Sequence, residues 1–146
     1  MKAAIIYTSK TGNTEELALE LRTHFSRRIH TDLFTINRFP LSQLHEYEAI
    51  IIGTYTWGDG EIPLEMMSLY QWIEREEASH LTTGVFGTGD SFYPNFCGAV
   101  DEFRDMLYVH TNLAATLKVE LSPQEGDWEK CEKFADILMN RIKQPV

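Results

Sequence analysis

Five short apolar runs, separated by stretches of helical periodicity, constrain the fold of this sequence more than any other feature. Most of the runs are rich in isoleucine or valine and do not alternate between apolar and polar residues. Such runs are typical of strands that are buried on both faces of a parallel sheet. The predicted strands cover residues 3–7, 33–36, 49–54, 85–87 and 117–121.

The stretches between these strands repeat apolar residues at intervals of three or four, as on one face of a helix. The four stripes are Leu17, Leu21 and Phe25; Met66, Leu69, Tyr70 and Ile73; Ala99, Phe103, Met106 and Leu107; and Cys131, Phe134, Ala135, Leu138 and Ile142. A further helical turn is expected in the connection 39–44. Alternating strands and helices predict a doubly wound α/β fold, with right-handed crossovers that place helices on both faces of the sheet.

The length of 146 residues suits one domain, residues 1–146, which needs no disulfide or metal to hold it together. Cys97 and Cys131 form no C-x-x-C pair, and the five histidines have no catalytic or metal-ligand spacing. Free cysteines suit a reducing compartment, and no apolar stretch approaches a signal peptide or a membrane span. We therefore expect a cytoplasmic protein with no metal site.

The formal net charge of −9 and the pI of about 4.9 limit the classes of partner. A negative field repels nucleic acid and anionic lipid, and it attracts basic protein surfaces. A negative net charge can also serve solubility alone. The charge therefore indicates a class of partner only if the sequence also contains a binding site.

In doubly wound folds, ligands lie beyond the carboxyl ends of the strands, in the loops that follow them. The first such loop, residues 8–14, reads Thr-Ser-Lys-Thr-Gly-Asn-Thr and opens a helix. Hydroxyls, free backbone N–H groups and the helix dipole would together bind a phosphate, although an ordinary helix cap has the same residue types. The sequence has no P-loop, and its nearest match to G-x-G-x-x-G, residues 87–92, lacks the third glycine. With these two nucleotide-binding motifs excluded, the loop suits the phosphate of a mononucleotide.

Two further loops bring aromatic residues to the same edge of the predicted sheet. Residues 54–60 place Trp57 beside two glycines, and residues 87–98 combine glycines, an acid and aromatics before a helix. Core packing is the alternative for Trp57, because a large ring is costly to expose. Taken together, a phosphate site and two aromatic walls fit a flat tricyclic ring on a ribityl phosphate.

Residues 8–14, 54–60 and 87–101 resemble the flavodoxin family in order and spacing, and the resemblance spans nearly the whole chain. Without a long insertion near the fifth strand, the chain is similar to the short-chain subgroup. The resemblance implies a three-layer α/β/α sandwich around a five-stranded parallel sheet of order 2-1-3-4-5. It also implies an electron-transfer protein rather than an enzyme, which carries single electrons at low potential on non-covalently bound FMN.

The resemblance further implies roles for individual residues. Trp57 is similar to the aromatic residue on the inner face of the flavin ring, and Tyr93 to the one on its outer face. The phosphate would be held by Ser9, Thr11, Gly12, Asn13 and Thr14, and the ring-binding loops would contribute Thr54, Tyr55, Thr56, Gly58, Asp59, Thr88, Gly89, Asp90, Phe96 and Cys97. Lys10 departs from the family pattern of a small polar residue; it either adds a cation near the phosphate or points to solvent.

Gly58 occupies the position where, in the family, a backbone peptide turns over when the flavin gains its first electron. The Gly58 carbonyl would then accept a hydrogen bond from nitrogen 5 of the flavin, in a type II′ turn that needs positive φ at Gly58. Asp59, Glu61 and Asp90 would disfavour the anionic reduced flavin.

The expected partners are a reductase of the ferredoxin/flavodoxin–NADP type and redox acceptor enzymes, which would meet a monomer through its acidic face. The carboxylates of this face are Asp59, Glu61, Glu65, Asp90 and Glu102. Three alternatives share the predicted fold: a flavin-dependent reductase, a flavodoxin-like activator of a metalloenzyme, and a flavin-free signalling or scaffold domain.

Overall fold

The computed structural model describes residues 1–76 and 78–143, and its centre is one sheet of five parallel strands. The strands are β1 (Lys2–Tyr7), β2 (His30–Thr35), β3 (Ala49–Tyr55), β4 (Thr82–Gly89) and β5 (Asn112–Glu120). They lie in the order β2-β1-β3-β4-β5, and every neighbouring pair is parallel. The predicted sheet and its order are confirmed.

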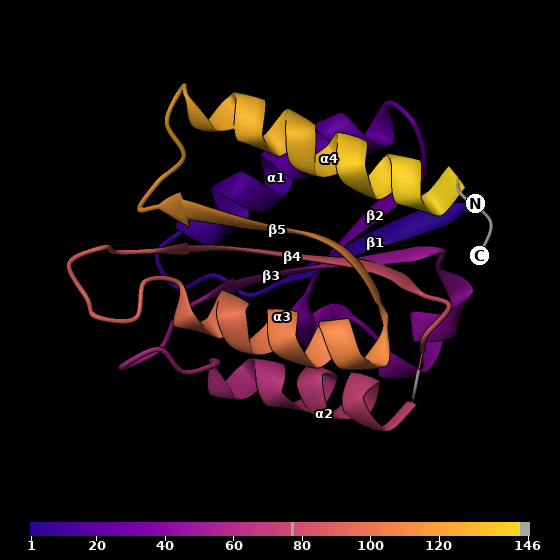
Figure 1. Cartoon of the computed structure of the whole chain (residues 1–146), viewed down its shortest axis with the longest axis horizontal. Helices are drawn as coiled ribbons and strands as arrows, with labels where there is room; N and C mark the ends of the chain where they lie inside the picture. Colours follow the sequence, from indigo (N-terminus) through magenta and orange to yellow (C-terminus); the bar gives the residue numbers. More distant parts are fainter. Residues whose placement is uncertain (77, 144–146) are drawn as a thin grey trace.

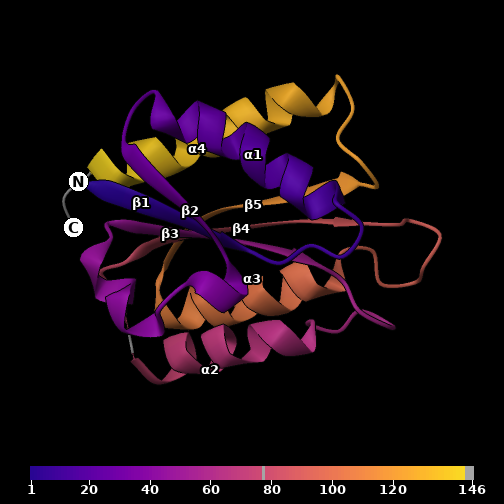
Figure 2. The ribbon, with the colours of Figure 1, turned by 180° about the vertical axis from the view of Figure 1, so that it is seen from behind.

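Helices cover both faces of this sheet, as Figures 1 and 2 show from opposite sides. One layer contains α1 (Asn13–Ser26) and α4 (Asp127–Lys143), and the other contains α2 (Met67–Glu76) and α3 (Gly98–His110). Each layer encloses its own apolar core against the sheet. Because the central strands β1 and β3 are buried on both faces, their sequences are nearly continuous apolar runs.

β1 and β3 are each one residue longer than predicted, and the other three strands differ from the predicted runs by more. Thr82 and Thr83 are buried at the start of β4, where Thr83 shares a hydrogen bond of 2.7 Å with the Thr111 hydroxyl. The edge strand β5 begins at Asn112, five residues before the predicted run, and its buried residues are Leu117 and Val119. β2 begins earlier, at His30, and ends before Ile36, which starts a short 3₁₀ turn. Backbone pairing extends these strands through residues that form no buried apolar run.

In the part of the chain that the structure describes, the connections between elements contain three 3₁₀ turns. They cover Ile36–Arg38, Leu41–Glu46 and Leu64–Met66. The second of them confirms the helical turn predicted in the link between the second and third strands.

The parallel strands bring three loops to one edge of the sheet. β1, β3 and β4 end next to one another, with Tyr7 opposite Gly53 and Tyr55 opposite Thr88. The loops that follow them, residues 8–12, 56–63 and 90–97, lie at the left end of the molecule in Figure 1. The N-terminus lies at the opposite end. Among the helices of the described residues, none is long and apolar enough to cross a membrane.

Candidate functional site

The loop after β1 forms a polar cradle at the N-terminus of α1. The Ser9 hydroxyl accepts hydrogen bonds of 3.2 Å from the backbone N–H groups of Gly12 and Glu15. Gly12, with φ +97°, turns the chain into the helix. The first N–H groups of a helix, here those of Asn13 and Thr14, have no carbonyl partner within it, and the helix dipole is positive at this end. The loop can therefore bind an anion.

Side-chain contacts fix this loop to the neighbouring strands. The buried Thr14 hydroxyl shares a hydrogen bond of 2.7 Å with the hydroxyl of Thr88 on β4. The hydroxyls of Thr8 and Tyr55 both donate to one oxygen of Glu65, at 2.8 Å each. Burial alone would raise the pKa of Glu65, but its backbone hydrogen bond, the two hydroxyls and the nearby Lys10 charge lower it below its usual value.

The loop after β3 contains a tight turn built around Gly58. The N–H of Gly60 donates to the Trp57 carbonyl at 3.3 Å, and Trp57 and Glu61 pair as an antiparallel bridge. Gly58 has φ +55°, whereas Asp59 has no positive φ. These signs match a type II′ turn with Gly58 as its first central residue, as the sequence predicts.

The loop after β4 packs closely on that turn. A Cβ on Gly98 would lie 2.6 Å from the Gly60 Cα, so the two backbones touch where only glycines fit. The Asn95 amide donates to the Asp59 carbonyl and ties the loops together. Within the loop, the Asp90 carboxylate accepts a hydrogen bond of 2.9 Å from the Phe92 N–H.

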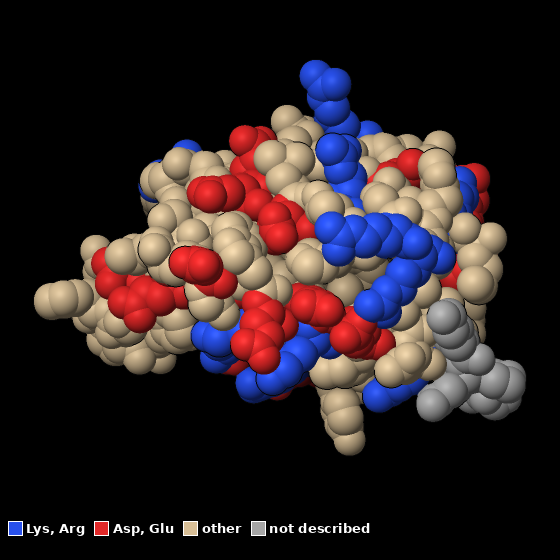
Figure 3. Space-filling view, turned by 90° about the horizontal axis from the view of Figure 1, so that it is seen from above, with Lys and Arg blue, Asp and Glu red and all other residues tan. Residues whose placement is uncertain are grey.

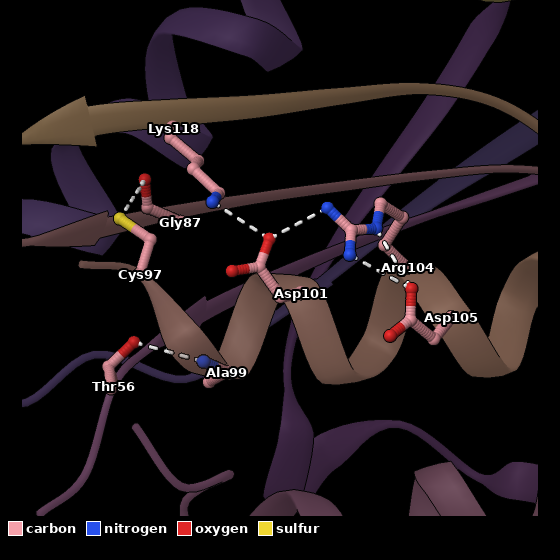
Figure 4. A network of polar contacts seen from close by, with 8 residues as sticks. All are labelled: Thr56, Gly87, Cys97, Ala99, Asp101, Arg104, Asp105 and Lys118. Atoms are coloured by element: carbon pink, nitrogen blue, oxygen red, sulfur yellow. Dashed lines mark hydrogen bonds and ion pairs between the residues drawn. The ribbon is translucent and has the colours of Figure 1, made fainter. Parts of the chain in front are cut away.

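Figure 4 shows the polar contacts around the start of α3, which follows this loop. The Thr56 hydroxyl accepts a hydrogen bond of 3.2 Å from the Ala99 N–H, which joins the second loop to the helix. Asp101 pairs with Lys118 of β5 at 2.7 Å and with Arg104 at 2.9 Å. Burial raises the pKa of the Cys97 thiol to about 11, so this side chain is a neutral packing group.

Two adjoining cavities open between the three loops. The larger, of about 310 Å³, lies under Trp57 and Tyr93, which are 49% and 62% exposed and thus outside the core. The smaller, of about 190 Å³, extends along the first loop. The larger is lined by Lys10, Thr56, Trp57, Gly58, Gly89, Asp90, Tyr93, Asn95 and Cys97, and the smaller by Lys10, Thr11, Asn13, Tyr55, Thr56, Thr88, Gly89, Asp90 and Leu121.

Most of the predicted site residues line one of these cavities, and the others lie behind or beside them. Ser9, Gly12 and Thr14 shape the first loop, and Thr54 is fully buried behind the second. Asp59 lies in the exposed turn, and Phe96 packs on the core next to α3. The structure therefore places all three predicted loops together, with fewer side chains facing the cavities than the prediction named.

Two cavity-lining residues were missing from the prediction. Asn95 packs against Gly60, and Leu121 donates its N–H to the Gly89 carbonyl at 2.7 Å. Leu121 was predicted as the last residue of the fifth strand, but it has φ +54° and lies just beyond β5. The only feature of the sequence that could have indicated Leu121 as a site residue was its position after the last strand, at the same edge of the sheet as the three loops.

The charges around the cavities are mostly negative. Asp59 and Glu61 belong to the second loop and Asp90 to the third, while Lys10 adds a cation at their centre. On the face seen in Figure 3, Lys and Arg gather mainly over the middle of the molecule. An anion-binding cradle beside an open aromatic cavity fits a flat cofactor that carries one phosphate. No group of three or more His, Cys, Asp or Glu among the described residues could hold a metal ion.

Comparisons with known proteins agree with this geometry. A model of the flavodoxin family matches residues 5–134. The chain is 39% identical over 139 residues to probable flavodoxin 1 of Bacillus subtilis (strain 168). This match covers 92% of this chain and 87% of that protein. A flavodoxin of Streptococcus pneumoniae TIGR4 superposes with a TM-score of 0.89 at 36% identity, over 97% of this chain and 99% of that one.

A short-chain flavodoxin associated with a bacterial microcompartment superposes with a TM-score of 0.93 at 26% identity, over 98% of this chain and 99% of that one. The match to the family model and the agreement in fold extend over nearly the whole sequence. Flavodoxins are flavin-binding electron carriers rather than enzymes. This chain belongs to the flavodoxin family, in its short-chain subgroup.

Proposed function

We propose that this chain, as a single domain, binds one FMN without a covalent bond and carries single electrons at low potential. One observation carries the proposal: the anion cradle at the start of α1 opens directly into the aromatic cavity, and both are lined by Lys10. The sequence has no dinucleotide signature for a second phosphate. The ligand that suits this pair of cavities is a mononucleotide.

Within this proposal, each loop has its own part. Ser9, Thr11, Gly12, Asn13 and Thr14 hold the phosphate through hydroxyl and backbone N–H donors. Trp57 lies against the inner face of the ring and Tyr93 against the outer face. Thr54, Tyr55, Thr56, Gly58, Asp59, Thr88, Gly89, Asp90, Phe96 and Cys97 belong to the two loops that enclose the ring. The bound flavin supplies the one-electron chemistry, and the protein controls its potential.

The carboxylates near the cavities favour a low potential. A negative charge placed near a flavin opposes the further negative charge that reduction adds. Asp90 lines both cavities, and Asp59 lies in the turn that borders the larger one. At an effective dielectric constant of about 20, a like charge at about 10 Å opposes reduction by roughly 1.7 kcal/mol. Several such charges shift a potential substantially.

The same charges define the partners that we propose. A flavin reductase of the ferredoxin/flavodoxin–NADP type would supply electrons, and redox enzymes would accept them, through basic patches that face this acidic edge. Cys97 and Cys131 are free and buried, which suits a reducing compartment such as the cytoplasm. We further propose that the protein acts as a monomer.

Extraction of the cofactor from the purified protein tests the proposal. We expect one FMN per chain and little FAD by chromatography of the released flavin. The flavin-free protein should regain one equivalent of FMN on titration, which isothermal titration calorimetry measures. Recovery of FAD, or failure to bind FMN after reconstitution, contradicts the proposal.

A further inference from the structure

Lys10 lies at the junction of the two cavities and is the residue that departs from the family pattern. Its backbone belongs to the anion cradle, but its Nζ lies 4.1 Å from the centre of the Trp57 ring. Lys10 lines both cavities, together with Thr56, Gly89 and Asp90. The ammonium group therefore covers part of the aromatic surface on which a flavin ring would stack.

We propose that Lys10 couples recognition of the phosphate to access to Trp57. When no anion is in the cradle, the Lys10 ammonium packs on the face of the Trp57 ring. When a phosphate is in the cradle, the ammonium contacts the phosphate instead and leaves the ring accessible. Lys10 is thus a positioning residue that selects a phosphorylated flavin over one without a phosphate. The proposal rests on the assignment of this edge as an FMN site.

The two contacts available to Lys10 differ in strength. Trp57 is half exposed, and an ammonium on an exposed ring gains little because water competes for the charge. A phosphate in the cradle carries up to two negative charges and offers charge-assisted hydrogen bonds, which are among the strong ones in proteins. When a phosphate is bound in the cradle, the Lys10 ammonium therefore contacts the phosphate rather than the Trp57 ring.

The neighbouring acids do not hold the Lys10 ammonium in place, so it can contact either Trp57 or a bound phosphate. The acids around Lys10 include Glu65, whose pKa the Lys10 charge helps to lower, Asp90 across the cavities, and Asp59 and Glu61 of the second loop. Glu65 accepts hydrogen bonds from Thr8 and Tyr55, and Asp90 accepts one from the Phe92 N–H. No carboxylate of the described residues forms an ion pair with Lys10 within 4.0 Å. The lysine can thus exchange Trp57 for a phosphate without breaking a salt bridge.

The coupling has opposite consequences for two flavins that share one ring system. Riboflavin has no phosphate, so its ring must displace the ammonium from Trp57 and gains nothing in return. FMN displaces the same contact and replaces it with a stronger one. Removal of the Lys10 charge should therefore weaken FMN binding and strengthen riboflavin binding.

Calorimetric titration of the full-length, flavin-free protein measures this difference. In Lys10→Gln we expect the Kd of FMN to rise about ten-fold and that of riboflavin to fall about three-fold. Lys133→Gln is the matched control, because it removes the same charge from an exposed position on α4, where Lys133 pairs with Glu129 at 3.8 Å. The control should leave both constants unchanged. Equal changes for the two flavins in Lys10→Gln would overturn the inference.

Inorganic phosphate provides a second readout that a merely structural lysine would not affect. Because coupling is reciprocal, phosphate should tighten riboflavin binding to the wild-type protein, relative to sodium chloride at the same ionic strength. The same addition should have no effect on Lys10→Gln. A phosphate effect of the same size in both proteins contradicts the coupling. If the wild-type protein binds no FMN, the proposed function itself fails; if it binds FMN and Lys10→Gln changes neither test, only this inference fails.

Discussion

The aromatic residues of this protein divide by burial at the scale of single side chains. Phe25, Phe86 and Phe103 are fully buried in the two cores, whereas Trp57 and Tyr93 remain about half exposed or more beside the larger cavity. Exposure of rings this large costs free energy unless a flat partner covers them. Their placement therefore suits stacking on a cofactor.

We expect Trp57→Ala and Tyr93→Ala each to weaken FMN binding by about 1 to 3 kcal/mol, the range for lost stacking of a base on an aromatic side chain. Calorimetric titration of the flavin-free variants measures the loss. Tyr108→Ala is the control, because Tyr108 is also exposed, at 77%, but lies near the far end of α3. Unchanged affinity in both wall variants would mean that neither ring contacts the flavin.

Glu65 shows how one carboxylate links the first loop to β3. Its folded pKa lies below the ordinary value because Thr8, Tyr55 and its own backbone donate to it, and Lys10 lies nearby. A carboxylate with a lowered folded pKa stabilises the fold above its unfolded pKa, and this contribution is lost as the pH falls through the folded pKa.

Glu65→Gln should therefore destabilise the protein near neutral pH, and the difference from wild type should shrink as the pH falls below about 4.5. Urea unfolding at a series of pH values gives the difference in free energy of unfolding. Glu129→Gln, on the exposed face of α4, is the control and should show little such trend. A Glu65→Gln difference that is constant with pH would show that the lowered pKa does not contribute.

At the scale of elements, the centres of the strands could be predicted from sequence and their ends could not. Burial on both faces requires apolar residues, so β1 and β3 are evident as runs of alanine and isoleucine. Thr82 and Asn112 begin their strands through backbone pairing, which carries no side-chain signal. Secondary structure was thus predictable where the side chains determine it.

For the site, the three loops could be predicted from the sequence, but the contacts that form when these loops pack could not. A parallel sheet must bring the ends of β1, β3 and β4 together, so the three loops could be combined from sequence. The contributions of Asn95 and Leu121 depend on a close contact with Gly60 and on a left-handed backbone, and both arise only after the loops have packed. Residue types alone do not report such contacts.

The turn of residues 57–60 is the element on which the flavin potential is expected to depend. Gly58 has φ +55°, and a Cβ there would meet no atom closer than 3.7 Å. Alanine at this position is therefore opposed by backbone strain and not by a clash. Such strain costs about 1 to 3 kcal/mol.

In the proposed function, the positive φ of Gly58 is required when its carbonyl accepts a hydrogen bond from the singly reduced flavin, whereas oxidised FMN makes no such demand on the turn. We therefore expect Gly58→Ala to make the first one-electron potential more negative by on the order of 40 to 130 mV, with the affinity for oxidised FMN nearly unchanged. Spectroelectrochemical titration measures the potential, and calorimetry measures the affinity. Gly126→Ala is the control, since Gly126 has no positive φ and open space around its Cα. An equal loss of affinity in every redox state, with the first potential unmoved, would show that Gly58 only forms a tight turn.

At the scale of the whole molecule, acidic residues exceed basic ones, and they also do so in the loops at the site. The chain carries 22 acidic and 13 basic residues, so acids are in excess overall. In the loops 8–12, 56–63 and 90–97, Lys10 is the only Lys or Arg, against Asp59, Glu61 and Asp90. Lys and Arg gather mainly over the middle of the face formed by α1 and α4, away from the loops (Figure 3). A basic partner is therefore attracted to the loop edge, where a cofactor would be accessible.

Electron transfer from a reductase with a basic patch should consequently slow as salt rises, because the Debye length is only about 8 Å at physiological ionic strength. Stopped-flow measurement of the reduction rate across a salt series tests this expectation. The double variant Asp59→Asn/Glu61→Gln should be reduced more slowly at low salt and should lose part of the salt dependence. Glu129→Gln/Glu132→Gln removes the same charge from exposed positions on α4 and should behave as wild type. A rate that does not change with salt, or an equal loss in both double variants, would show that the acidic loop edge does not guide docking.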